Sequence, residues 1–194
     1  MGCGKSSVGR YLSELLCCPF IDLDNVIEET QGRSIPEIFT TDGEAAFRQM
    51  ELETLTQIIE SRQHRGSLPS QATGLSLCGQ MGSTVSVLSA AGTANCDNII
   101  IALGGGAVMT PECADLVREK THCIYLRASV DTLLSHLEKE AACRPMLQGA
   151  SLRTRIEELM ALRNSTYEST AHLVIDTDGR TVEEIATALL HRGA

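Results

Sequence analysis

Short apolar runs alternate along this chain with longer segments in which apolar residues recur every three or four positions. The first pattern is typical of buried strands and the second of amphipathic helices. The apolar runs are Pro19–Ile21, Asn98–Leu103, Cys123–Leu126 and Leu173–Ile175. The periodic segments include residues 5–16, where Val8, Leu12 and Leu15 share a predicted face, and residues 151–170. This alternation predicts an α/β domain of three layers (α/β/α) with a mostly parallel sheet.

Capping signals predict where several helices begin. Ser34–Glu37 has the spacing of a capping box with proline in its first turn, and Thr181–Glu184 has the same spacing before the last helix. Thr110 precedes a proline at a predicted helix start, Ser129 is a predicted cap, and a further helix follows Gly43. Several helices therefore have a local start signal, and the chain is predicted to be one domain over residues 1–194.

Residues 62–97 interrupt the pattern. They are rich in Ser, Gly, Ala, Thr and Gln and carry almost no charge after Arg65. A structureless stretch of this length is unusual inside a compact domain, so we interpret it as an insertion. It follows a helix and precedes a strand, and such connections lie at the end of a sheet opposite the ligand. We therefore expect this segment to be peripheral.

Composition limits the classes of partner. Of 194 residues, 43% are apolar, and the net charge is −9. Broad nucleic-acid or anionic-membrane binding usually needs a basic surface, so neither is expected. No apolar run approaches the roughly 18 residues that span a membrane. We expect a cytoplasmic monomer.

The eight cysteines include no C-x-x-C pair and no paired Cys/His ligand spacing. Reduced, mostly buried thiols are therefore expected, although Cys78 and Cys96 could pair in principle.

The N-terminus carries the back half of a phosphate-binding loop, Gly2-Cys3-Gly4-Lys5-Ser6, at the start of a helix. Glycines let backbone N–H groups close around phosphate oxygens, and the helix N-terminus adds partial positive charge. Lys5 would reach the β- and γ-phosphates, and the Ser6 hydroxyl would ligate Mg²⁺. The full motif needs a glycine two places before Met1, so a chance Gly-rich start is the alternative.

Two carboxylates, Asp22 and Asp24, follow the strand that contains Phe20 and Ile21. The carboxyl ends of parallel strands form the edge where ligands bind. One carboxylate could lie near Mg²⁺ and the other could hold a substrate hydroxyl. Asp24 could equally be a helix N-cap.

Three later motifs are ambiguous when taken singly. Arg48 and Glu51 are three apart on one helix face and can pair, which is also what a surface ion pair would do. Gly104–Gly106 follow a buried strand, where glycines suit either close approach of a ligand or a flexible turn. A lid is predicted at about residues 139–150, with Arg144 as a candidate lid residue. Arg163 lies late in a helix, and each arginine alone could be a solvated side chain.

Taken in order, these motifs resemble those of shikimate kinases. The P-loop, F-I-D-x-D, S-I-x-E-I-F, G-E-x-x-F-R-x-x-E, G-G-G-A-V, R-P-x-L and R-x-x-x-Y all occur, from Met1 to about Asp178. The resemblance implies a P-loop kinase fold with parallel strand order 2-3-1-4-5. It also implies transfer of the ATP γ-phosphate to the 3-hydroxyl of shikimate, with Mg²⁺, in the pathway to chorismate.

The resemblance also implies roles for individual residues. Asp24 matches the carboxylate that holds the shikimate hydroxyls, and Asp22 the residue near Mg²⁺. Arg48 and Arg163 match the arginines that grip the shikimate carboxylate, while Arg144 matches the lid arginine over the phosphates. The remaining matches are to the ATP loop (Gly2, Cys3, Gly4, Lys5, Ser6, Ser7) and to the backbone that lines the substrate (Gly104, Gly105, Gly106).

One departure stands out, because the strand that should precede the P-loop is missing. In the family it lies between the strands that contain Leu103 and Ile124, so a gap is predicted there, and we expect the natural protein to start upstream of Met1. Two alternative functions remain possible. The chain could be another small-molecule kinase of this fold, such as a gluconate kinase, or a non-catalytic nucleotide-binding protein.

Overall fold

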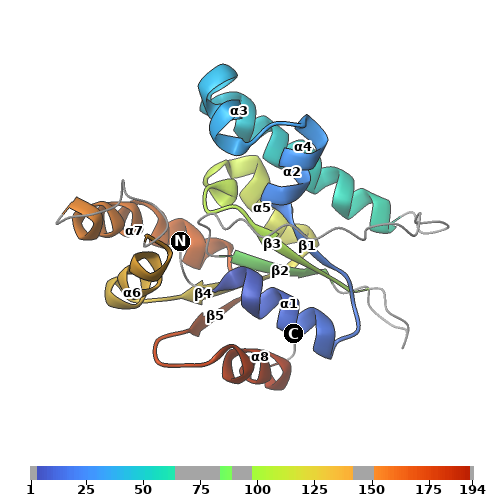
Figure 1. Cartoon of the computed structure of the whole chain (residues 1–194). Coiled ribbons are helices and arrows are strands. Elements are labelled where there is room, and N and C mark those ends of the chain that lie inside the picture. Colours follow the sequence, from blue (N-terminus) through green and yellow to red (C-terminus); the bar gives the residue numbers. More distant parts are fainter. Residues whose placement is uncertain (1–3, 64–83, 89–97, 142–150, 193–194) are drawn as a thin grey trace.

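A five-stranded sheet forms the middle of the molecule, with helices on both faces (Figure 1). The structure is a computed structural model, and it describes residues 4–63, 84–88, 98–141 and 151–192. The strands are β1 (Phe20–Asp22), β2 (Thr84–Leu88), β3 (Ile99–Leu103), β4 (His122–Arg127) and β5 (Leu173–Asp176). The helices are α1 (Lys5–Leu15), α2 (Leu23–Gln31), α3 (Ile35–Thr41), α4 (Gly43–Gln63), the 3₁₀ helix η1 (Ala107–Met109), α5 (Pro111–Lys120), α6 (Val130–Ala141), α7 (Ser151–Thr170) and α8 (Val182–His191).

Successive residues of the central strands point into two separate apolar clusters. Ile100 and Ile124 belong to the cluster that contains residues of α1, α6 and α8. Ile99, Ile101 and Tyr125 belong to the cluster that contains residues of α2, α4 and α5. Burial on both faces explains why β3 is a continuous apolar run rather than an alternating one. The predicted α/β class and its three layers agree with this arrangement.

The centre of the sheet differs from the prediction. The strand order is β1-β3-β2-β4-β5, in which β1 and β3 are parallel, β4 and β5 are parallel, and β2 is antiparallel to both of its neighbours. The sheet is therefore mixed, and the expected order 2-3-1-4-5 with an empty central position is not what the structure has. The expectation that the whole of residues 62–97 is peripheral is also wrong, because Thr84–Leu88 occupies that central position.

Backbone hydrogen bonding explains how this segment can take the place of another strand. Strands β3 and β4 both have N–H and C=O groups that face the central position, and buried backbone groups need partners. Strand β2 meets both, since Val85 lies opposite Ala102 on one side and Ile124 on the other. Its sequence, Thr-Val-Ser-Val-Leu, is rich in residues that favour strands. Because a backbone ladder forms in either direction, an antiparallel strand can fill the position.

Local capping signals predicted the helix starts well. The Ser34 backbone N–H donates to Glu37 Oε2 at 2.8 Å, and the Thr181 backbone N–H donates to Glu184 Oε2 at 2.8 Å. Helix α7 covers the predicted residues 151–170. The N-cap of α2 is Asp22 rather than Asp24, which lies in the first turn of that helix.

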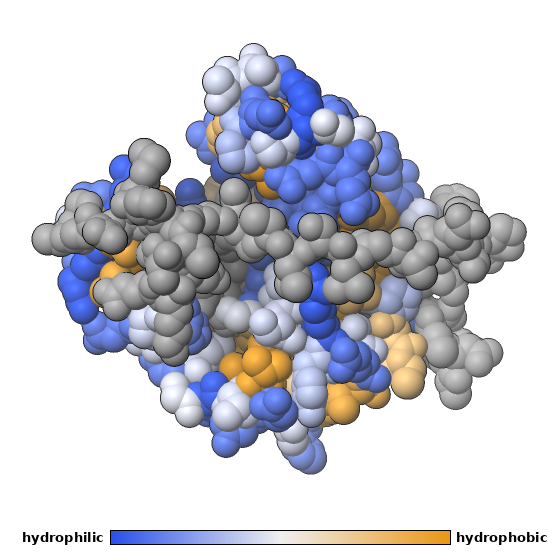
Figure 2. Space-filling view, in the orientation of Figure 1, coloured by the Kyte–Doolittle hydropathy of each residue, from blue (hydrophilic) through white to orange (hydrophobic). Residues whose placement is uncertain are grey.

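The surface of the upper part in Figure 2, formed by α2, α3 and α4, is mostly hydrophilic, and apolar areas appear lower down, near α1 and α8. Leu15, expected on the buried face of α1, is 47% exposed, and Leu190 of α8 is 37% exposed. Residue 15 is the last residue of α1. The periodicity correctly placed Val8 and Leu12, which are fully buried.

Two sequence-based expectations concern residues that lie partly outside the described ranges. Helix α6 extends to Ala141, so the rest of the predicted lid at about residues 139–150, with Arg144, is not described. In the described ranges the cysteines are free thiols: Cys17, Cys18, Cys113 and Cys123. The possible Cys78–Cys96 pair lies outside them. Among the described helices, none is both long and apolar enough to cross a membrane.

Candidate active site

The start of α1 gathers groups suited to phosphate. Gly4 caps the helix with φ 77°, a left-handed conformation that glycine adopts without strain. Lys5, the first helical residue, is only 5% exposed, and Ser7 is exposed in the same turn. A helix N-terminus with a buried lysine is an anion-binding arrangement, because the N–H groups and the ammonium are all positive. Gly2 and Cys3 lie outside the described residues.

Beside this helix start lies an oxygen pair that could hold a metal ion. The Ser6 hydroxyl donates to Asp22 Oδ2 at 2.9 Å, which joins α1 to the end of β1. A hydroxyl and a carboxylate are hard oxygen donors that suit Mg²⁺, which in phosphoryl-transfer sites is held by one or two protein groups, by phosphates and by water. In the described parts of the chain, no group of three or more His, Cys, Asp or Glu could hold a metal ion. The Ser6–Asp22 pair therefore fits a Mg²⁺ ion whose other ligands are the phosphates of a bound nucleotide and water.

The turn formed by Gly104–Gly106, after β3, is the centre of the second half of the site. A Cβ atom at Gly104 would lie 2.6 Å from both Asp24 Oδ1 and Glu51 Oε1. A Cβ atom at Gly106 would collide with the guanidinium of Arg48. Side chains from α2 and α4 therefore lie directly against Gly104 and Gly106, and a side chain at either position would have to displace Asp24, Glu51 or Arg48.

The carbonyl of Gly105 faces α7. It accepts a hydrogen bond from Arg163 Nη1 at 3.3 Å and another from the Tyr167 hydroxyl. The two donors are four residues apart and so lie on one face of the helix. The glycine turn thus brings Arg163 of α7 and Arg48 of α4 to two sides of one short backbone segment.

Arg48 is held by two acidic residues of its own helix. Its Nη1 pairs with Glu51 Oε2 at 2.5 Å and its Nη2 with Glu44 Oε1 at 2.9 Å. The predicted Arg48–Glu51 pair is therefore present, but it is not a surface pair, because Glu51 is only 1% exposed. The guanidinium is fixed in orientation next to the glycine turn.

Burial raises the pKa of both carboxyl groups near Gly104. The pKa of Asp24 is raised to about 6 by burial, against the opposing effect of the Lys5 charge. The pKa of Glu51 is raised to about 7, again by burial, with Arg48 acting in the opposite direction. Glu51 Oε1 has no hydrogen-bond partner, so burial outweighs the ion pair made by its other oxygen. The site therefore holds two carboxyl groups that titrate near neutral pH.

We expect Glu51→Gln to change how stability depends on pH. The unfolded chain releases this proton near pH 4.5, whereas the folded chain holds it until about pH 7. Folding takes up a proton between these values, so the free energy of unfolding falls as pH rises through this window. The neutral glutamine removes that dependence. Relative to the wild type, the melting temperature of the variant should therefore gain roughly 5–10 °C from pH 5 to pH 8, because about two pH units of this window correspond to about 3 kcal/mol.

The matched control is Glu53→Gln, which removes an exposed carboxylate from the same helix. Its melting temperature should follow that of the wild type at every pH. Parallel curves for Glu51→Gln and the wild type between pH 5 and pH 8, measured by circular dichroism, would contradict the raised pKa.

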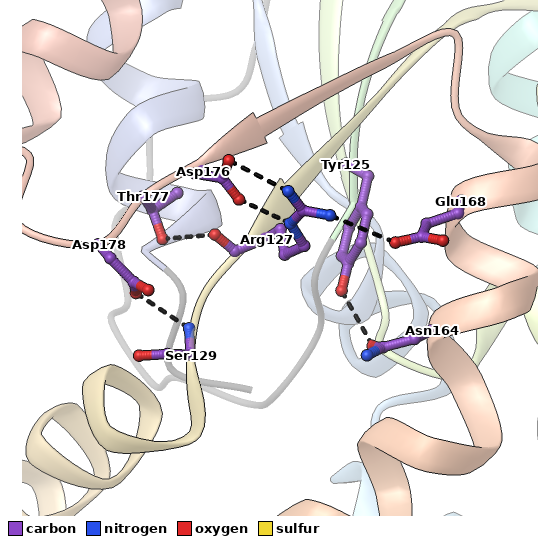
Figure 3. A network of polar contacts seen from close by, with 8 residues as sticks. All are labelled: Tyr125, Arg127, Ser129, Asn164, Glu168, Asp176, Thr177 and Asp178. Atoms are coloured by element: carbon purple, nitrogen blue, oxygen red, sulfur yellow. Dashed lines mark hydrogen bonds and ion pairs between the residues drawn. The ribbon is translucent and has the colours of Figure 1, made fainter.

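A network of polar contacts joins the ends of β4 and β5 to α7 (Figure 3). Arg127 donates to both carboxylate oxygens of Asp176, at 2.6 and 3.1 Å, and pairs with Glu168 of α7 at 3.4 Å. The Tyr125 hydroxyl donates to Asn164 Oδ1 at 3.1 Å. Such exposed ion pairs contribute little stability singly, but together they define the position of the helix that carries Arg163.

The loop that follows β5 belongs to the same network. Asp178 accepts the Ser129 backbone N–H at 2.9 Å, and the Thr177 hydroxyl donates to the Arg127 carbonyl at 3.1 Å (Figure 3). These contacts tie the segment after β5 to the start of α6.

The predicted site residues in the described ranges thus lie at one edge of the sheet, in two adjoining groups. Lys5, Ser6 and Asp22 form the first; Asp24, Arg48, Gly104–Gly106 and Arg163 form the second. The charge of Lys5 acts on the pKa of Asp24, which links the two groups.

Sequence reasoning missed several contributors. It gave no role to the hydroxyls of Tyr125 and Tyr167, to Asn164, or to the unpaired oxygen of Glu51. The spacing R-x-x-x-Y could have indicated Tyr167, because it puts this residue on the helix face of Arg163.

Comparisons with known proteins show which family this chain resembles. The family model described as shikimate kinase matches residues 1–66 and 85–193. The shikimate kinase of Marinomonas sp. (strain MWYL1) is 34% identical over 190 residues, which cover 98% of this chain and 86% of that protein. That of Francisella tularensis subsp. holarctica (strain FTNF002-00 / FTA) is 31% identical over 189 residues, covering 97% and 88%.

Solved structures are similar over almost the whole chain. The shikimate kinase from Acinetobacter baumannii in complex with shikimate has a TM-score of 0.72 at 26% identity, covering 99% of this chain and 87% of that one. The enzyme from Bacteroides thetaiotaomicron has a TM-score of 0.73 at 24% identity, covering 99% and 93%. The second likeness bears on the fold alone.

Proposed function

Because this chain belongs to the shikimate kinase family of ATP-dependent phosphotransferases, we propose that it transfers the γ-phosphate of ATP to the 3-hydroxyl of shikimate. The observation that carries the proposal is the convergence of Arg48, Arg163 and Asp24 on the glycine turn after β3, close to Lys5. An acceptor with one carboxylate and several hydroxyls matches this set of groups.

Arg48 and Arg163 would bind the acceptor carboxylate. A planar guanidinium can form two parallel hydrogen bonds to a carboxylate, and its charge makes them strong. The two arginines come from different helices, α4 and α7, and both contact the glycine turn. They would therefore fix the acceptor in one orientation, which is the main requirement of phosphoryl transfer.

Asp24 would hold the reacting hydroxyl. With a pKa of about 6 it is a better proton acceptor than an ordinary aspartate and is still mostly ionised at neutral pH. It adjoins Gly104 and feels the charge of Lys5, so it stands between the acceptor groups and the phosphate groups. We assign it orientation of the hydroxyl and removal of its proton.

The start of α1 would bind ATP through Gly2, Cys3, Gly4, Lys5, Ser6 and Ser7, with Arg144 reaching over the phosphates. Ser6 and Asp22 would hold Mg²⁺. When bound, this ion neutralises part of the negative charge of the phosphates. Lys5 would stabilise the charge that develops on the γ-phosphoryl oxygens. We further infer that the protein acts as a monomer in the cytoplasm.

A coupled assay of ADP release tests the proposal. With MgATP, we expect turnover that depends on shikimate and is at least about a hundredfold lower with gluconate, because a site built to pair with specific polar groups rejects ligands that do not match them. Faster turnover with gluconate would favour the related small-molecule kinase. If neither acceptor releases ADP but ATP binds, the non-catalytic function would replace the proposed one.

A further inference from the structure

The carbonyl of Gly105 is shared by two donors that differ in character. The Tyr167 hydroxyl is neutral and lies on a side chain that is 5% exposed. The Arg163 guanidinium is charged, partly exposed, and donates over the longer distance of 3.3 Å. A charged guanidinium gains more from a carboxylate than from a neutral carbonyl. Arg163 should therefore leave Gly105 when a carboxylate is within reach.

The departure of Arg163 creates a problem for the carbonyl that it leaves. Gly105 is buried, and a buried carbonyl without a partner is unfavourable. The Tyr167 hydroxyl already donates to this oxygen, so the carbonyl stays satisfied when Arg163 moves. Without the hydroxyl, Arg163 would be the remaining donor of the pair, and binding a ligand would have to break its bond.

The surroundings hold Tyr167 and the backbone of α7 in place. The rings of Tyr125 and Tyr167 pack with their centroids 5.2 Å apart, and both residues are buried. The Tyr125 hydroxyl holds Asn164, the neighbour of Arg163, from β4 (Figure 3). The helix is thus held one and four residues after Arg163, so a change of partner needs only the arginine side chain to turn.

We propose that Tyr167 is a positioning residue for acceptor binding, whose hydroxyl keeps the Gly105 carbonyl hydrogen-bonded while Arg163 turns from that carbonyl to the acceptor carboxylate. The inference rests on the proposed function, because it takes shikimate as the acceptor. It adds a residue that does not touch the acceptor and acts through Arg163 and the glycine turn.

The test is Tyr167→Phe, which keeps the ring and removes the hydroxyl. We expect the KM for shikimate to rise about tenfold, equivalent to about 1.4 kcal/mol, with kcat and the KM for ATP each within about twofold. Tyr11→Phe is the matched control, since it removes the hydroxyl of a tyrosine of α1 that packs against the other apolar cluster. Its KM for shikimate should change less than threefold.

A double-mutant cycle with Arg163→Ala separates positioning from simple packing. If Tyr167 acts through Arg163, removing its hydroxyl should have little further effect on the KM for shikimate once Arg163 is gone. Additive effects would overturn the inference, as would an unchanged KM in Tyr167→Phe. Loss of folding in Tyr167→Phe would also overturn it, because the hydroxyl would then serve the fold and not binding.

Different results would contradict the role of Tyr167 and the proposed kinase function. A wild-type protein that turns over shikimate, with Tyr167→Phe unaffected, contradicts the role of Tyr167 and leaves the proposed function standing. A wild-type protein that does not turn over shikimate contradicts both.

Discussion

Replacing Lys5 by alanine should lower kcat/KM for the shikimate-dependent reaction by roughly 10³-fold, because one preorganised charge at a developing anion is worth about that much. Lys5 begins α1 at a helix N-terminus and is buried, so its ammonium acts where water screens it little. The Lys5 charge also lowers the pKa of Asp24, against the effect of burial, so this charge lies near the groups that would bind the acceptor. Initial rates at varied ATP and shikimate measure the effect.

Two further variants separate the role of the charge from other effects. Lys120→Ala removes an exposed lysine from the last turn of α5 and should leave the kinetics unchanged. Lys5→Arg keeps the charge but changes its shape, and it should recover only part of the activity. An Lys5→Ala protein that retains wild-type kinetics would remove the start of α1 from the phosphate site.

Replacing Val85 by proline should destabilise the fold by about 3 kcal/mol, which lowers the melting temperature by roughly 6–12 °C. Val85 is paired on both sides, with Ala102 of β3 and Ile124 of β4. Proline has no N–H, so one hydrogen bond of a central strand is lost and its ring disturbs the ladder. Thermal unfolding measured by circular dichroism detects the change.

Val85→Thr is the control for this variant. Threonine also favours strands and keeps the backbone N–H, so it should unfold within a few degrees of the wild type. A Val85→Pro protein that melts like Val85→Thr would mean that Thr84–Leu88 does not form the middle of the sheet. Slow hydrogen exchange of the Ile101 and Ile124 amides in the wild type, and faster exchange in the proline variant, would support the pairing independently.

Features that depend on neighbours in sequence were predicted well. The capping pairs Ser34–Glu37 and Thr181–Glu184 are three residues apart, so a single turn of helix brings them together whatever the rest of the chain does. The same holds for the Arg48–Glu51 pair. The glycines after β3 were also recognisable, because a buried strand that ends in three glycines is a strong local pattern.

Features that depend on residues far apart in the sequence were not predicted. Tyr167 meets Gly105 across 62 positions, and no local pattern specifies that meeting. The raised pKa of Glu51 comes from burial beneath Gly104 and beside Asp24, although its spacing from Arg48 alone indicated an ordinary ion pair. Burial and long-range contact are properties of the packed molecule.

The sequence by itself determined where several helices begin, the burial of β3 and β4, and the order of motifs that resembles that of shikimate kinases. Only the tertiary structure decided that Thr84–Leu88 fills the central position of the sheet and that α7 meets the glycine turn through both Arg163 and Tyr167. The physical reason is that helices are made by contacts three or four residues apart, whereas a strand can pair with any segment that meets its backbone groups.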